Sequence, residues 1–247
     1  MPMRAVDRLG LADAVTVANA AVGFLAVLAA TIDLALAARL VLVAAIADGL
    51  DGVVARHRGS TPAGPYLDSL ADVASFGVAP ATIVAVAALE TPAPMASWLV
   101  AVSVGVAALF VAMSVARLGM YTAYDSECGE TVGVPTTLAA TILSAAVLAG
   151  YTDPLLLVVG AAAFALLMGS SVRYPDLHAQ DALVMGLVQA AVVVTPAVRA
   201  VARALPAWIG EGFAFALLFL ATGYLLLGPW LYWGDETRRR EADVDRL

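Results

Sequence analysis

The stretch that decides the fold runs from Ala47 to Asp72 and reads ADGLDGVVARHRGSTPAGPYLDSLAD. It places four aspartates, Asp48, Asp51, Asp68 and Asp72, in or beside long apolar segments. A carboxylate at bilayer depth costs about 2.5–3.5 kcal/mol on insertion scales, so four unpaired ones would cost on the order of 10 kcal/mol. A chain tolerates this only where cations neutralise the carboxylates. The function is therefore expected to lie in this stretch.

The composition around the stretch is that of an integral membrane protein. The 247 residues are 62% hydrophobic and 13% charged, whereas soluble domains are about 45–50% apolar and about 25% charged. The formal net charge is −7, which argues against a nucleic acid as partner. We expect an all-α fold, a polytopic membrane helix bundle.

Hydrophobic segments of about 20 residues predict the membrane spans. Eight segments qualify, over residues 11–31, 36–56, 67–91, 96–118, 134–151, 153–171, 182–203 and 210–233. They are expected to form a single membrane-embedded domain over 1–233, followed by a charged cytoplasmic tail over 234–247.

The positions of the arginines predict the orientation, because cytoplasmic loops carry an excess of basic residues. With the N-terminus in the cytoplasm, Arg39, Arg199 and Arg203 lie outside and the other ten of the 13 basic residues lie inside. The aspartates then lie near the cytoplasmic surface of the cell membrane, and a site built on them faces the cytoplasm.

Helical spacing places the aspartates on two stripes. Asp48, Asp51, Gly52 and Ala55 are spaced 0, +3, +4 and +7, which is one face of a helix. Gly64, Asp68 and Asp72 are spaced 0, +4 and +8, again one face. A short loop joins the two segments, so we expect antiparallel neighbouring helices whose four carboxylates converge on one pocket.

Such a pocket repels itself unless cations bind in it. Carboxylate oxygens suit Mg²⁺ or Mn²⁺, and two such ions about 4 Å apart would stabilise the attacking and leaving oxygens of a phosphoryl transfer. Arg56 offers a fork of donors for a phosphate. Two other interpretations stay open: the acids form ion pairs with arginines that only stabilise the fold, or they line the path of a cation transporter.

The same positions carry a family motif, Asp48-x2-Asp51-Gly52-x2-Ala55-Arg56-x7-Gly64-x3-Asp68-x3-Asp72. It resembles the signature of the CDP-alcohol phosphotransferases, and every fixed position is present. The resemblance implies a six-helix core that is often dimeric, and the transfer of a substituted phosphate from a CDP-linked donor to an alcohol with release of CMP.

Further segments resemble the phosphatidylserine synthase branch of that family, which includes archaetidylserine synthases. They are Leu67–Ala81, Ala116–Leu118, Gly133–Pro135 and the first-span pattern Thr16-x2-Asn19-x3-Gly23. The chain departs from the branch after Leu118, where it reads GMYTAYDSEC.

Roles follow from the resemblance residue by residue. Two metal ions would be held by Asp48, Asp51 and Asp68. Asp72 would also face the metals and act as general base, with a plain fourth ligand as the alternative. The small residues Gly52, Ala55 and Gly64 would leave room for the CDP-lipid. Arg56 would contact its phosphates.

The branch implies L-serine as acceptor. Arg117 is the first candidate for its carboxylate, with Arg173 and Arg58 as rivals, and Ser75 either touches substrate or only packs. The donor lipid is diacylglycerol- or archaeol-based, in a membrane of such lipids. Glycerol 3-phosphate or inositol phosphate is the alternative acceptor. A homodimer is expected.

Overall fold

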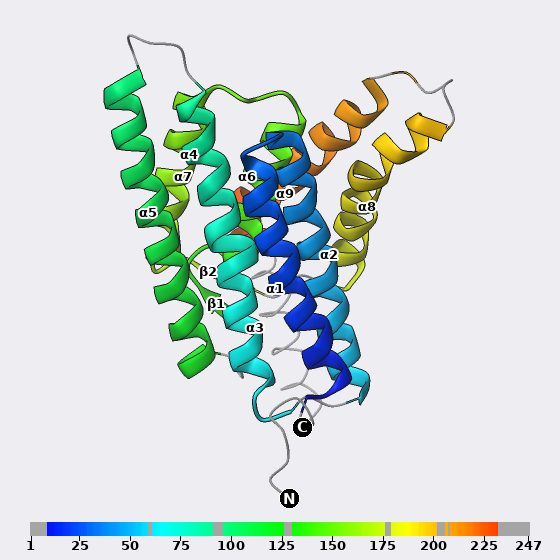
Figure 1. Cartoon of the computed structure of the whole chain (residues 1–247). Coiled ribbons are helices and arrows are strands. Elements are labelled where there is room, and N and C mark those ends of the chain that lie inside the picture. Colours follow the sequence, from blue (N-terminus) through cyan, green and yellow to red (C-terminus); the bar gives the residue numbers. More distant parts are fainter. Residues whose placement is uncertain are drawn as a thin grey trace, which may run out of the picture.

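The computed structural model describes residues 9–58, 61–90, 96–125, 130–175, 179–201, 206 and 208–231. In these ranges the chain is a bundle of helices that run up and down one common direction (Figure 1). The elements are α1 (Leu11–Ala30), α2 (Leu34–Arg58), α3 (Gly64–Asp72), the π-helical segment η2 (Val73–Val78), α4 (Ala79–Leu89), α5 (Ala96–Met120), the π-helical segment η3 (Tyr121–Asp125), β1 (Glu130–Val132), α6 (Thr136–Leu148), α7 (Pro154–Met168), β2 (Arg173–Pro175), α8 (Ala179–Val201) and α9 (Trp208–Leu231).

All eight predicted segments are helical, and five helical stretches are long and apolar enough to cross a membrane. These are 11–30, 64–89, 97–124, 181–201 and 208–230. Helix α2 is as long as α5, but it carries Arg39 and the first two aspartates. The spans predicted over 134–151 and 153–171 are too long, because α6 has 13 residues and α7 has 15. Gly150, with a φ of +91°, lies just beyond the end of α6.

Helix α1 lies between α2 on one side and the continuous α3–η2–α4 helix on the other (Figure 1). Its buried positions recur every three or four residues and are mostly small: Ala12, Thr16, Asn19, Gly23, Ala26 and Ala30. Small residues on a helix face let two backbones approach closely, which is the usual basis of helix packing in membranes.

Helix α1 approaches η2 closely where Gly23 meets Ser75. A Cβ atom at Gly23 would lie 2.8 Å from the backbone nitrogen and Cα of Ser75, so only glycine fits. The hydroxyl of Ser75, which is fully buried, donates a 3.0 Å hydrogen bond to the Asn19 carbonyl. The structure therefore gives Ser75 a packing role. The π-helical turn that contains it begins directly after Asp72.

Helix α6 forms the centre of the bundle, with 10 of its 13 residues buried. The short strands β1 and β2 pair antiparallel, with Val132 opposite Arg173. Gly133 follows β1 with a φ of +78°, and a Cβ there would meet the Met168 carbonyl oxygen at 2.2 Å. The glycine of the Gly133–Pro135 segment is thus required by this turn.

Candidate metal site and adjoining cavities

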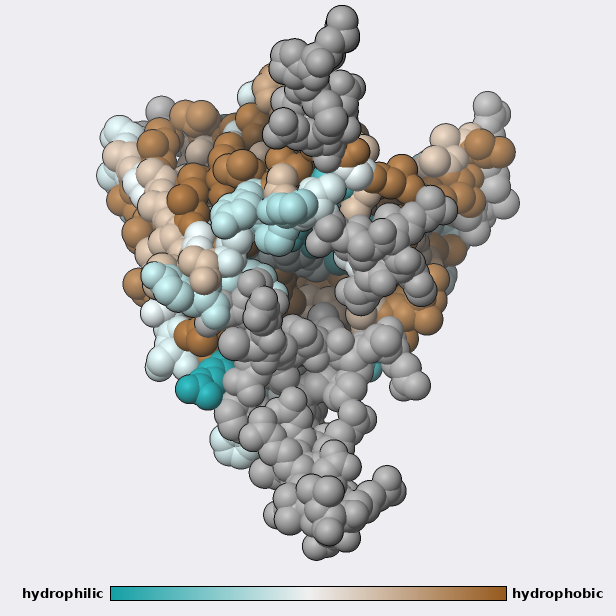
Figure 2. Space-filling view, turned by 90° about the horizontal axis from the view of Figure 1, so that it is seen from below, coloured by the Kyte–Doolittle hydropathy of each residue, from teal (hydrophilic) through white to brown (hydrophobic). Residues whose placement is uncertain are grey.

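The two predicted acid stripes lie at the same end of the bundle. Helix α2 descends toward that end and α3 begins there, at the lower edge of the view (Figure 1). Seen from below, a group of polar residues lies near the middle of the described part of this face, and apolar residues lie above it and on both sides (Figure 2). The predicted antiparallel arrangement of the two acid-bearing helices is present, with α1 packed against both of them.

Three of the four aspartates meet. Carboxylate oxygens of Asp48, Asp68 and Asp72 all lie within 4.8 Å of one another. Asp72 is buried, and its Oδ1 atom has no hydrogen-bond partner in the described part of the chain. A buried carboxylate oxygen without a donor is costly unless a cation binds it. The donor set, made only of carboxylate oxygens, fits a hard divalent cation such as Mg²⁺ or Mn²⁺.

Asp51 lies next to this group but is not one of the three. It is buried, and its Oδ2 atom accepts a 2.7 Å hydrogen bond from the hydroxyl of Thr16 on α1. A hydrogen bond to a carboxylate fixes the rotamer of the side chain and leaves the second oxygen for another partner. Helix α1 thus orients Asp51 of α2 through the hydroxyl of Thr16.

A cavity of about 240 Å³ lies beside these acids. Asp51 and Asp68 line it, together with the two glycines that the stripes predicted, Gly52 and Gly64. The absence of side chains at both glycines opens this space to a ligand. The side chains of Ala55, Arg56 and Arg58, which were predicted to contact the donor or the acceptor, lie outside the described residues.

Asp13 also lines this cavity and ties together the elements around it. Its Oδ2 atom accepts hydrogen bonds of 2.8 Å from the Gly10 backbone N–H and 2.8 Å from the Thr61 hydroxyl. Thr61 precedes α3 by three residues, and its carbonyl accepts from the Gly64 N–H at 3.0 Å. The start of α3 is therefore tied to the start of α1, which fixes Gly64 in the wall of the cavity.

A second cavity of about 430 Å³ adjoins the first. It is lined by residues of α5, η3 and the ends of β1 and α7, including Arg117, and Tyr121 lines both cavities. The guanidinium of Arg117 donates a 2.7 Å hydrogen bond to Thr131 and lies 5.4 Å from the centre of the Tyr121 ring. A half-buried cation thus faces a cavity next to the acids.

The other two candidates for the acceptor carboxylate are placed differently. Arg173 is exposed on β2, opposite Val132 at the edge of the 430 Å³ cavity. Arg58 is the last residue of α2, and its side chain is not described. Of the three predicted arginines, Arg117 is the one whose described side chain lines a cavity beside the acids.

Sequence reasoning missed several residues that line the 240 Å³ cavity, namely Asp13, Ser69, Tyr121 and Thr122. The hydroxyls of Ser69 and Thr122 hydrogen-bond each other and so join α3 to η3. Tyr121 and Thr122 lie in the segment where the chain departs from the phosphatidylserine synthase pattern. The departure from the family pattern was therefore the sequence signal for these residues. In the structure this part of the chain forms η3, which lines the cavity.

Comparisons with known proteins agree with the motif. The family model described as CDP-alcohol phosphatidyltransferase matches residues 9–169, which include both acid stripes, α5 and α6. The archaetidylserine synthase of Methanothermobacter thermautotrophicus is 32% identical to the chain over 179 residues, covering 70% of this chain and 73% of that protein.

Proposed function

The chain belongs to the CDP-alcohol phosphatidyltransferase family, and we propose that it joins a CDP-activated lipid to L-serine and releases CMP. The lipid would carry a diacylglycerol or an archaeol body. The relative that acts as an archaetidylserine synthase supports the serine acceptor and favours archaeol. The observation that carries the proposal is the convergence of three carboxylates beside a cavity that Gly52 and Gly64 line.

The metals would be bound by Asp48, Asp68 and Asp72, with Asp51, oriented by Thr16, completing the set. Two divalent ions, Mg²⁺ or Mn²⁺, are the proposed cofactors. Bound there, they would neutralise the donor pyrophosphate and polarise the phosphorus that is attacked.

The CDP-lipid would enter the 240 Å³ cavity, because the missing side chains at Gly52 and Gly64 leave room for the nucleotide and its phosphates. Ala55 and Arg56 belong to the same motif, and we assign them to this donor site as well. The lipid tails would lie among the surrounding apolar helices, so the site sets no strict limit on their chemistry.

Serine would bind in the adjoining 430 Å³ cavity, with its carboxylate on the guanidinium of Arg117. The contact of Arg117 with Tyr121 and Thr131 holds the guanidinium in place before serine arrives. A positioned cation selects an acceptor that bears a carboxylate. Because Tyr121 lines both cavities, the hydroxyl of the bound serine would lie on the side of the acids.

The reaction forms one bond and breaks one. The serine hydroxyl oxygen attacks the phosphorus that carries the lipid, the bond from this phosphorus to the CMP oxygen breaks, and CMP leaves with the electron pair. Asp72, the acid that we assign as general base, would take up the hydroxyl proton through whichever carboxylate oxygen is not bound to metal.

The decisive test is release of CMP by the purified full chain in detergent, with CDP-archaeol or CDP-diacylglycerol, Mg²⁺ or Mn²⁺, and each candidate acceptor in turn. CMP release that requires both serine and metal is the expected result. Release with glycerol 3-phosphate or inositol phosphate in place of serine would keep the family and overturn the acceptor. Flux of cations into sealed vesicles without CMP release would favour the transporter interpretation.

Two further properties stay predictions. The site is proposed to face the cytoplasm, which labelling of cysteines introduced at either end of the bundle in intact cells would test. The chain is also proposed to act as a homodimer, as the resemblance implies, and its mass in detergent would test that.

A further inference from the structure

A third cavity lies at the end of the bundle opposite the aspartates. Its volume is about 170 Å³, several times the ~30 Å³ that one water occupies in the liquid. Four helices line it, with Arg39 from α2, Leu148 from the end of α6, Thr195, Pro196 and Arg199 from α8, and Gly210 from α9. Helix α2 begins at this end and reaches the catalytic acids only at its other end.

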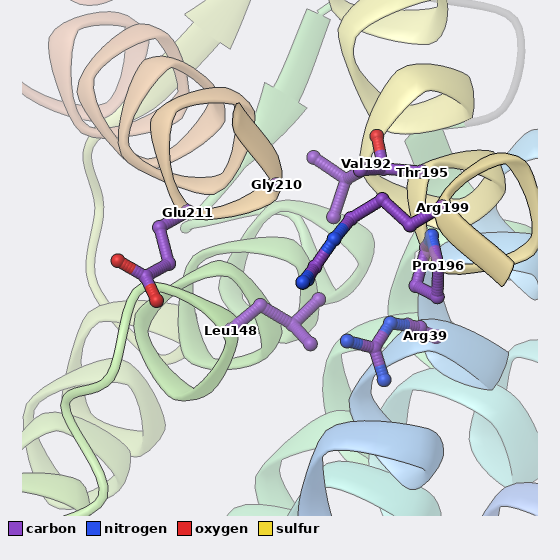
Figure 3. A pocket seen from close by; sticks show the side chains of 8 residues that line it. All are labelled: Arg39, Leu148, Val192, Thr195, Pro196, Arg199, Gly210 and Glu211. Atoms are coloured by element: carbon purple, nitrogen blue, oxygen red, sulfur yellow. The ribbon is translucent and has the colours of Figure 1, made fainter. Parts of the chain in front are cut away.

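Two arginines point into this cavity from different helices. Figure 3 shows the guanidinium groups of Arg39 and Arg199 directed into the same space above α2, while the carboxylate of Glu211 points away from them. Within the described residues neither guanidinium pairs with an acid, and the Nε atom of Arg39 is buried without a hydrogen-bond partner. The cavity therefore contains two converging cations and an unused donor.

Both arginines lie near helix ends. Arg39 is five residues from the start of α2 and Arg199 is two residues from the end of α8, so they lie roughly 8 Å and 3 Å from those ends at 1.5 Å per residue. In a helix that crosses the bilayer, as α8 is long and apolar enough to do, residues this close to an end lie where hydrocarbon gives way to headgroups. Arginines at this depth are stabilised by anions, and lipid phosphates are the anions that a membrane supplies there.

The cavity is built into the helices around it. Pro196 lies in the interior of α8 and has no N–H to donate to the Val192 carbonyl, which bends a helix at that point. On the facing helix, a Cβ at Gly210 would lie 3.2 Å from the Thr195 side chain, so α9 packs tightly against α8 beside the bend. The gap is thus fixed by a proline and a glycine in the two helices that frame it.

We propose that Arg39 and Arg199 together bind one phosphate group, either the phosphate of an anionic membrane lipid or a free phosphate ion. Guanidinium groups are planar forks of donors that match phosphate oxygens, and two of them from separate helices grip one anion from two sides. The anion would link α2 to α8 and so hold the α8–α9 pair against the core. This site takes no part in the transfer reaction at the other end.

Binding is measured on the delipidated full chain in neutral detergent. Divalent metal is removed, so that the aspartate end does not bind the anion through a metal. One arm titrates inorganic phosphate by calorimetry. The other adds phosphatidylglycerol or, as the control of zero net charge, the zwitterionic phosphatidylcholine, and counts bound lipid by native mass spectrometry. Saturation at one anion per chain is expected. Binding in the lipid arm alone identifies a lipid headgroup as the ligand, and binding in the phosphate arm alone identifies free phosphate. Binding in both arms shows that the site accepts a phosphate group from either source.

The variants Arg39→Gln and Arg199→Gln, alone and combined, should weaken binding roughly tenfold or more. Glu211→Gln changes a charge in the same cavity without removing a cation, so it should bind at least as tightly as the wild type. If the glutamine variants do not fold, Arg39→Lys and Arg199→Lys keep the charge but lose the fork, and a smaller loss is expected. A wild type that binds neither probe, or arginine variants that bind with unchanged affinity, would overturn the proposal.

Discussion

The contact between Thr16 and Asp51 gives the sharpest test of how the site is built. Thr16→Val removes the hydroxyl that donates to Asp51 at 2.7 Å and keeps the shape of the side chain. The Asp51 oxygen is then left buried without this donor. A hydrogen bond to a charged group is worth about 1.5–3 kcal/mol, and each 1.36 kcal/mol is about a tenfold change in an equilibrium constant.

Thr16→Val should therefore raise the Mg²⁺ or Mn²⁺ concentration for half-maximal CMP release by about 10- to 100-fold, the loss expected when a partner of a metal-binding residue is removed. Saturating metal should restore most of the turnover, because the coordinating carboxylates themselves remain. The measurement is a metal titration of CMP release by the purified chain at fixed CDP-lipid and serine.

Two controls make this result specific. Thr16→Ser keeps the hydroxyl and should keep the metal dependence of the wild type. Thr82→Val is the same chemical change on α4, where the hydroxyl donates only to the Val78 carbonyl of its own helix, and it should also leave the metal dependence unchanged. An identical metal requirement in Thr16→Val and the wild type would refute the claim that α1 orients Asp51 for a metal.

Four other outcomes are expected. Asp72→Asn should lower turnover by about 100- to 10,000-fold, the range for loss of a general base, while circular dichroism shows the helices intact; near-normal turnover would remove Asp72 from the chemistry. Arg117→Ala should raise the KM for serine more than it lowers kcat, whereas an unchanged KM would exclude it from the acceptor cavity. Gly23→Ala should destabilise the fold by about 1–3 kcal/mol in thermal unfolding, because its Cβ would strike the Ser75 backbone; Gly105→Ala, where a Cβ meets nothing within 4 Å, is the neutral control. A chelator should abolish CMP release reversibly, and activity that survives it would contradict the metal site.

Much of the fold could be predicted from the sequence because a bilayer imposes strong rules. Spans must be apolar and helical, so hydropathy located the eight helical segments of the described chain, with α3–η2–α4 counted as one. Spacing along a helix then placed Asp48, Asp68 and Asp72 on facing stripes, and the structure brings their carboxylates together.

Other features depend on contacts between distant residues, which periodicity does not encode. Thr16 and Asp51 are 35 residues apart and lie on different helices. Pairing of β1 with β2 joins three-residue segments that are too short to give a strand pattern. The π-helical turn after Asp72 adds no composition signal of its own, because its residues suit an α-helix equally well. Such features need the packed structure.

Because α6 and α7 are short, the helices of the bundle should not all respond in the same way to the thickness of the surrounding bilayer. At 1.5 Å per residue, α6 and α7 are roughly 20 and 23 Å long, against a hydrocarbon core of about 30 Å. Helix α6 is enclosed by its neighbours, so acyl chains do not meet its ends. The longer helices α5, α8 and α9 are mostly unburied within the chain, and we expect them to absorb hydrophobic mismatch by tilting. Longer or shorter acyl chains should thus tilt the outer helices and leave α3–η2–α4, which carries Asp68 and Asp72 and is the most buried of the five apolar stretches, at a more constant depth.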